Sequence, residues 1–171
     1  PLQIGRNIDP ETQWRAFADI FGSVARLGVK RQKQELLEAL RKVYVRAGVL
    51  VDDPEVRSDL QWGRVQPDEG GLIGQATGRA ISDLGSGERQ ELAVFRSCRV
   101  SLLDLYKEVV NKLSIVPARD TMLTGVLEGI VFRLNPLVQG AAAAQFSAGY
   151  GNIAIEELGK PWGVAIVEGG V

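Results

Sequence analysis

Glu88 to Leu113 reads ERQELAVFRSCRVSLLDLYKEVVNKL and contains the most sustained helical pattern of the chain. Its apolar residues recur at alternating spacings of three and four, which places them on one face of an α-helix. The residues of this seam are Phe95, Cys98, Leu102, Leu105, Val109 and Leu113. We therefore predict a single helix of about 26 residues, roughly 39 Å long, as the main structural element.

Three further helices are predicted from similar patterns. Residues 10–27 start with a capping Asp9 and a proline at the first helical position, and their aromatic side chains share one face. Residues 30–47 carry apolar side chains on one side and end at Gly48. Residues 119–135 are apolar around most of the helix circumference, so we expect this helix to lie at the centre of the fold.

The connections between these helices differ in composition. Residues 49–71 are acidic and irregular, with one helical turn predicted at 54–60. Residues 72–84 predict a weaker helix; a phosphate-binding loop is the less favoured alternative, because no Gly-Lys-Ser/Thr ending follows. Residues 136–171 form an irregular Gly/Ala-rich tail that we expect to pack on neighbouring subunits. The predicted fold is all-α, an antiparallel bundle of four to five helices in one domain spanning 1–171.

Composition excludes many classes of function. The chain has 171 residues, no histidine and one cysteine, which removes imidazole-dependent catalysis, His-ligated metals and internal disulfides. Glu156 and Glu157 point about 100° apart on a helix and do not form an acid/base pair, while Asp52, Asp53 and Asp59 lack EF-hand spacing. We predict no enzyme activity, no cofactor and no metal site. We also expect neither a signal peptide nor a membrane span.

Charge is balanced overall and uneven locally. The net charge is −1, and the 20 basic residues are 14 Arg and 6 Lys. Between residues 26 and 46 seven basic residues oppose Glu35 and Glu38, a local charge of +5. The candidate nucleic-acid-binding residues there are Lys30, Arg31, Lys33, Arg41, Lys42 and Arg46. A second set lies on the 88–113 helix opposite its apolar seam: Arg89, Arg96, Arg99 and Lys107.

Two interpretations of these basic faces stay open. The first is an ordinary solvated surface, because exposed charges are common and contribute little energy. The second is a track for a polyanion, with phosphate contacts that read no base. The aromatic residues on apolar faces favour core packing over base stacking. Trp62, beside Arg64 in the irregular segment, is the exception and is compatible with either role.

A histidine-free helical bundle with an Arg-bearing face, an acidic connection and a Gly/Ala-rich tail resembles the coat proteins of rod-shaped and filamentous viruses. The order of helices is similar to that of the tobacco-mosaic-like coat proteins, with Trp14 in the first helix and a late Trp162. Ile155-Glu156 before Trp162 loosely matches a pattern near the end of that family. The resemblance implies that Arg89, Arg96 and Arg99 face nucleic acid and that acids at 52–69 contact other subunits.

The function expected from these features is that of a structural coat protein, which polymerises into a helical filament around viral nucleic acid. Open helical growth follows from a heterologous contact that does not close into a ring. We expect partners to be copies of the chain and nucleic acid, RNA rather than DNA, in the virion and in the host cytoplasm during assembly. The alternative is an all-α adaptor that binds protein and no nucleic acid, and a carboxylate-dependent enzyme comes third.

Overall fold

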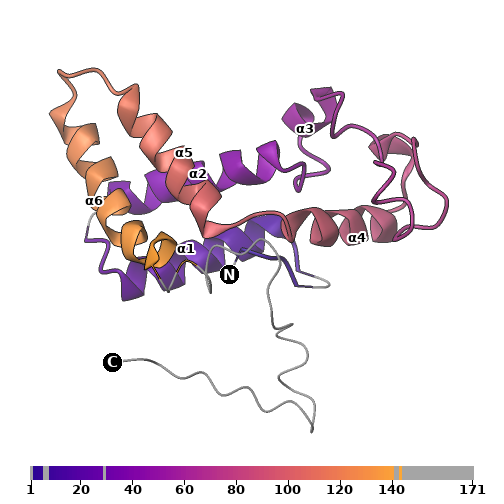
Figure 1. Ribbon diagram of the computed structural model, residues 1–171, viewed down its shortest axis with the longest axis horizontal. Helices are drawn as coiled ribbons and strands as arrows, with labels where there is room; N and C mark the ends of the chain where they lie inside the picture. The colour runs from indigo at the N-terminus through magenta and orange to yellow at the C-terminus, as the bar shows by residue number, and fades with distance from the viewer. Residues whose placement is uncertain (1, 6–7, 29, 141–142, 144–171) are drawn as a thin grey trace, which may run out of the picture.

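The computed structural model describes residues 2–5, 8–28, 30–140 and 143, and these residues contain six α-helices and no strand (Figure 1). The all-α class is therefore confirmed. Most of the predicted 136–171 tail lies outside the described residues. The helices are α1 (Pro10–Val24), α2 (Lys30–Arg46), α3 (Pro54–Ser58), α4 (Ser86–Ser97), α5 (Leu102–Ser114) and α6 (Thr121–Val138).

Local sequence signals start and stop the first helices. The Asp9 side chain accepts a hydrogen bond from the Thr12 N–H at 3.0 Å, and Pro10 opens α1 as predicted. Helix α1 ends at Val24, earlier than expected, and Arg26 adopts a left-handed φ of 50°. Helix α2 is followed by Gly48 with a φ of 69°, a conformation that glycine adopts without strain.

The prediction of one helix over residues 88–113 is wrong. The chain leaves helical geometry after Ser97, and α4 and α5 run in different directions from the connection (Figure 1). Ser101 starts α5 with a capping box: its hydroxyl accepts from the Asp104 N–H at 3.3 Å, while Asp104 accepts from the Ser101 N–H at 2.9 Å. The Ser-x-x-Asp spacing is therefore a helix start inside an otherwise continuous apolar pattern.

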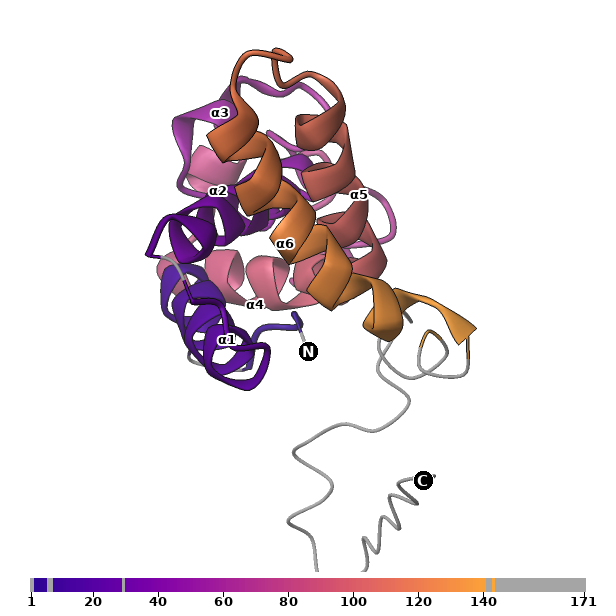
Figure 2. The same cartoon turned by 90° about the vertical axis from the view of Figure 1, so that its left-hand side faces the viewer.

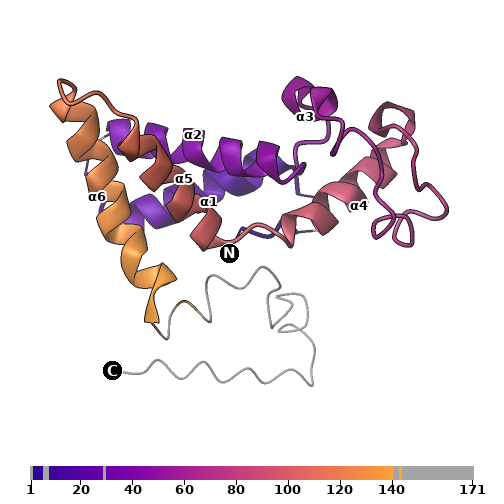
Figure 3. The ribbon, with the colours of Figure 1, turned by 45° about the horizontal axis from the view of Figure 1, so that its top comes forward.

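Residues 72–84 are also not the weak helix that we predicted. They form turns, with Gly74 and Gly78 at φ values of 58° and 81°, followed by a 3-10 turn at Ile81–Asp83. One isolated bridge pairs Arg64 with Ala80. These turns gather with α3 and α4 at the end of the molecule away from α6 (Figure 3). The helical turn predicted at 54–60 is present as α3.

Helix α2 lies at the centre of the packing, because it contacts α1, α5 and α6. Leu36, Leu40 and Tyr44 point into the core from α2 and are fully buried. The Tyr44 ring stacks on Trp14 of α1 with centroids 5.8 Å apart, and its hydroxyl donates to the Leu2 carbonyl at 2.6 Å. Leu105 of α5 is equally buried, as α5 and α6 pack side by side (Figure 2).

Helix α6 is an outer helix, and the expectation that it would be central is wrong. Leu127, Ile130 and Leu134 enter the core, but only five of its 18 residues are buried. By length and composition alone it is long and apolar enough to cross a membrane, the only such helix among the described residues. Figure 2 shows α6 in front, with α2 and α1 to one side and α5 to the other.

Candidate functional site

Carboxylates accompany five of the six predicted cations of α2. Three of these five cations pair within α2 or with α1: two pair with a residue four positions away on α2, and one pairs with a residue of α1. They are Arg31 with Glu35 at 4.0 Å, Lys42 with Glu38 at 3.4 Å, and Lys33 with Asp19. All three cations keep 39% or more of their side-chain surface exposed. Exposed pairs of this kind contribute only about 0–1 kcal/mol, so the cations could exchange partners.

Arg41 and Arg89 connect the helices to the acidic segment at 52–55. Arg41 donates to Asp53 at 2.6 Å and to Glu55 at 3.2 Å, and these two hydrogen bonds, Asp53 first, raise the pKa of the guanidinium. Arg89 of α4 contacts Asp52 at 2.8 Å, and Asp52 also pairs with Arg57. Three of the acids that the coat-protein resemblance assigned to subunit contacts, Asp52, Asp53 and Glu55, thus pair with arginines of the same chain.

Three ion pairs fasten α5 to α2. Arg46 contacts Glu108 at 2.5 Å, and that carboxylate has only 8% of its side chain exposed. Lys112 lies between Glu35 and Glu38, at 2.6 and 2.8 Å. The hydrogen bond from Lys112 lowers the pKa of Glu38 despite partial desolvation. Sequence reasoning missed Lys112, because neither its spacing nor its neighbours indicate that it faces the two acids of α2.

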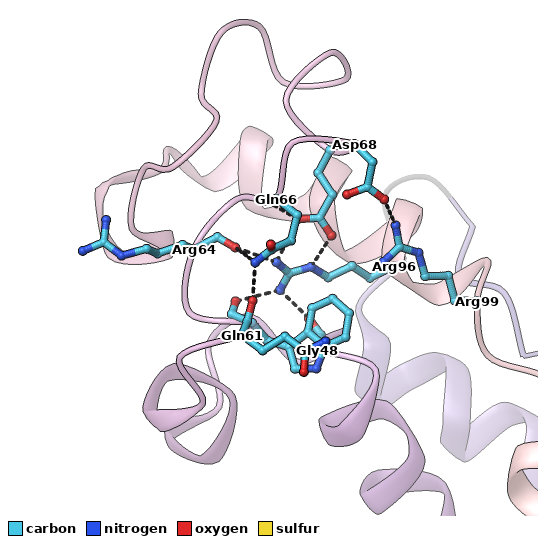
Figure 4. A network of polar contacts seen from close by, with 9 residues as sticks. Gly48, Gln61, Arg64, Gln66, Asp68, Arg96 and Arg99 are labelled. Carbon is cyan, nitrogen blue, oxygen red and sulfur yellow. Dashed lines mark hydrogen bonds and ion pairs between the residues drawn. The ribbon is translucent and has the colours of Figure 1, made fainter.

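Arg96 is fully enclosed between α4 and the turns at 61–69 (Figure 4). Its guanidinium makes two hydrogen bonds to Glu69, at 2.8 and 3.0 Å, and both side chains have no exposed surface. The remaining N–H groups donate to the carbonyls of Gly48, Trp62 and Arg64 at 3.0, 3.0 and 3.2 Å. An arginine has five N–H donors, and here each has an acceptor.

The assignment of Arg96 to nucleic-acid binding is therefore wrong. A buried guanidinium already paired with a buried carboxylate has neither the exposure nor the free donors to bind a phosphate. The sequence pattern misplaced Arg96 because α4 buries the face that carries Leu92, Ala93 and Arg96, and not the seam through Phe95. In the folded chain, the turns at 61–69 cover that side of α4.

Arg99 and Trp62 lie beside this buried pair. Arg99 pairs with Asp68, and its guanidinium lies 5.2 Å from the centre of the Phe95 ring (Figure 4). The half-buried Trp62 ring has the Arg96 guanidinium 5.1 Å from its centre and Arg99 at 6.0 Å. A shallow pocket of about 230 Å³ opens here, lined by Val43, Arg46, Ala47, Trp62, Arg99, Val100 and Asp104.

Lys30 and Lys107 are the two predicted cations for which the described residues supply no carboxylate within ion-pair distance. Both side chains are exposed, Lys30 at the start of α2 and Lys107 on α5. The ten predicted residues therefore do not form one continuous unpaired track. Seven of them are exposed or half-buried with an acid beside them, two have none, and Arg96 is enclosed.

An exposed apolar surface on α6 and α1 was not predicted. On α6 the side chains of Met122 and Phe132 are 62% and 77% exposed. Gly125 lies between them on the same side of the helix, with nothing within 4 Å of the position that a Cβ would take. Glu128 and Arg133 are the only charged residues of α6. The signal was the apolar pattern around the whole circumference, which leaves one face uncovered when the helix is at an edge.

Arg133 joins this face to the end of α1. Its guanidinium donates to the carbonyls of Ala25 at 2.6 Å and Arg26 at 3.3 Å, and so satisfies backbone groups that the helix leaves free. The residues next to these contacts are apolar and exposed: Phe132 on α6, and Val24 on α1 at 80%. We call Ile20, Val24, Met122, Gly125 and Phe132 the α6–α1 surface.

Catalytic and metal chemistry have few candidate groups among the described residues. Asp52 and Asp53 hold arginines, and the Asp59 side chain accepts from the Gln61 N–H at 2.8 Å. No cluster of three His, Cys, Asp or Glu side chains there could hold a metal ion. Glu156 and Glu157 lie outside the described residues.

The chain thus offers two surfaces with distinct chemistry, the paired cations around Trp62 and the apolar α6–α1 surface. Their assignment rests on contacts and exposure alone, because no protein-family model, no curated protein and no solved structure matches the chain.

Proposed function

We propose that the chain is a structural subunit that assembles with copies of itself through the α6–α1 surface. The observation that carries the proposal is the exposure of Met122 and Phe132 on one side of α6 and of Val24 on α1, with Arg133 linking the two helices. Soluble monomers rarely expose contiguous large apolar side chains, and such patches are typical of protein interfaces. Covering them removes apolar area from water at about 25 cal/mol per Å².

Charge supports the same proposal. Copies packed side by side repel one another when each carries a large net charge, and here the net charge is −1. Most cations are neutralised by acids of the same chain, so assembly does not depend on an external counterion. The antiparallel four- to five-helix bundle expected from the sequence is part of this proposal, with α1, α2, α5 and α6 around one core.

A second proposal, that the assembly encloses nucleic acid, has one specific support. The pocket at Trp62 places an aromatic ring beside Arg46 and Arg99, and Arg46 keeps 64% of its side chain exposed. Bases stack on aromatic rings while arginines hold the backbone, without sequence preference. Seven of the predicted residues would then exchange their acids for phosphates, and Lys30 and Lys107 would bind phosphates directly. This is the coat-protein hypothesis, with RNA as its favoured nucleic acid.

Sedimentation velocity over a wide range of protein concentration tests self-assembly. We expect the full chain to grow into large species as concentration rises, and electron microscopy to show filaments. The variant Phe132→Glu should stay monomeric, because it places a charge in the centre of the surface. Leu60→Glu is the matched control, since Leu60 is 93% exposed and lies near α3 at the other end of the molecule. A full chain that stays monomeric at every concentration overturns the proposal.

Binding of a fluorescent oligouridine, compared with oligothymidine of equal length, tests the nucleic-acid proposal. We expect binding that weakens steeply with salt and that quenches tryptophan fluorescence. Arg46→Glu should weaken it, whereas Arg15→Glu on α1 should not, because Arg15 is an exposed arginine outside the predicted set. No binding at low salt would leave a protein-only assembly, as in the adaptor alternative.

A further inference from the structure

We infer that residues 144–171 of one copy cover the α6–α1 surface of a neighbouring copy. This inference rests on the proposed self-assembly and names the two parts of the chain that meet. It makes the contact heterologous, because a segment of one copy binds a different surface of the next. Such a contact propagates as an open chain of copies when its rotation does not close a ring, whereas a self-complementary contact stops at a dimer.

The shape of the surface fits an extended or helical apolar segment. Met122 and Phe132 project on either side of Gly125, where no atom lies within 4 Å of the missing Cβ. A side chain from another segment can enter that space next to Met122. Phe132 and Val24 then extend the contact across the Arg133 junction onto α1. Glu128 and Arg133 are the only charged residues of α6, and the Arg31 guanidinium of α2 donates to the Met122 sulfur at 3.3 Å, so the surface is apolar with cations at its edges.

Residues 144–171 have the matching composition. Only Glu156, Glu157, Lys160 and Glu168 are charged in this stretch. Its apolar residues include Val164 to Val167 and five large side chains, namely Phe146, Ile153, Ile155, Leu158 and Trp162.

The position of the segment favours a neighbouring copy. It begins a few residues after the end of α6 at Val138, so covering Phe132 and Met122 of its own chain requires the chain to reverse its direction. A segment of 28 residues reaches up to about 90 Å when extended, and α6 is about 27 Å long. The segment can therefore reach across to the α6–α1 surface of a second copy without reversing.

Two full-length variants test this pairing. Phe132→Glu disables the surface and keeps the segment, while Trp162→Asp with Ile166→Asp disables the segment and keeps the surface. We expect each to stay monomeric alone, with association at least about tenfold weaker than that of the unmodified chain. An equimolar mixture should form a heterodimer and nothing larger, because only one intact pairing is available. Circular dichroism checks that both variants retain their helices, and Leu60→Glu should assemble normally.

Three results would overturn the inference without affecting self-assembly. In the first, the segment variant assembles as well as the unmodified chain, so the surface meets another part of the neighbour. In the second, the mixture forms no heterodimer, which places the segment elsewhere. In the third, phosphatidylcholine vesicles bind the unmodified chain and not Phe132→Glu, so a lipid surface is the occupant. A full chain that is monomeric throughout would instead remove the proposed function.

Discussion

Arg96 shows how completely one side chain can depend on the fold. Its five donors are satisfied by Glu69 and three backbone carbonyls, all inside a region with no exposed surface at either charged group. Replacing it with methionine leaves the Glu69 carboxylate buried without a partner. We expect Arg96→Met to lower the free energy of unfolding by about 3–5 kcal/mol, measured by urea denaturation.

The exposed neighbour Arg99 provides the comparison. Arg99→Ala removes a partly exposed pair with Asp68 and should cost no more than about 1 kcal/mol. The double variant Arg96→Met with Glu69→Met should recover much of the loss, since it leaves no unpaired buried charge. If Arg96→Met and Arg99→Ala lowered the free energy of unfolding equally, the hydrogen bonds of Arg96 would not hold the turns to α4.

At the scale of one element, the capping box at Ser101 decides where α5 begins. Ser101→Ala removes the acceptor for the Asp104 N–H and should destabilise the protein by about 1 kcal/mol. If residues 88–113 formed one continuous helix, the same change would be neutral or stabilising, because alanine is the better helix former. Thermal unfolding followed by circular dichroism distinguishes the two signs.

Two glycines of α6 have different surroundings, and replacing each with alanine should change the stability of the protein in opposite directions. A methyl group at Gly125 meets nothing, so Gly125→Ala should stabilise the helix by about 0.5–1 kcal/mol. At Gly129 the methyl group collides with the side-chain amide of Gln32, a residue that is only 8% exposed. We expect Gly129→Ala to be the less stable variant by about 1 kcal/mol in urea unfolding at low protein concentration. If Gly129→Ala were instead the more stable of the two variants, α6 would have to lie further from α2.

At the scale of the whole molecule, stability should fall in acid as the pairs between elements lose their charge. Lys112 holds α5 to Glu35 and Glu38 of α2, and its hydrogen bond lowers the pKa of Glu38 below the ordinary value of 4.5. A lowered folded-state pKa stabilises the protein above the unfolded value, and this contribution disappears as pH falls through the folded value.

Urea midpoints measured between pH 7 and pH 3 check this expectation. The unmodified chain should lose stability below about pH 4.5, and Lys112→Met should lose less over the same range, because the largest cause of the lowered pKa of Glu38 is removed. Lys107→Met is the control, since the exposed Lys107 has no carboxylate beside it among the described residues. Identical pH profiles for both lysine variants would contradict the proposed link between α5 and α2.

Much of the helical content could be predicted from the sequence, because caps, proline and apolar periodicity are local signals. Asp9-Pro10 and Gly48 bound α1 and α2 as expected. The candidate site could not be predicted in the same way. A helical wheel at Arg96 does not show which face of the helix another segment covers.

The sequence by itself determined the all-α class, the positions of most helix starts and the classes of chemistry that a chain without histidine cannot perform. Only the tertiary structure decided which charges are neutralised and which apolar side chains remain uncovered. Ion pairs such as Arg96 with Glu69 and Lys112 with Glu35 join residues distant in the chain. Charge and hydrophobicity are properties of single residues, whereas pairing and burial depend on how elements come together in space.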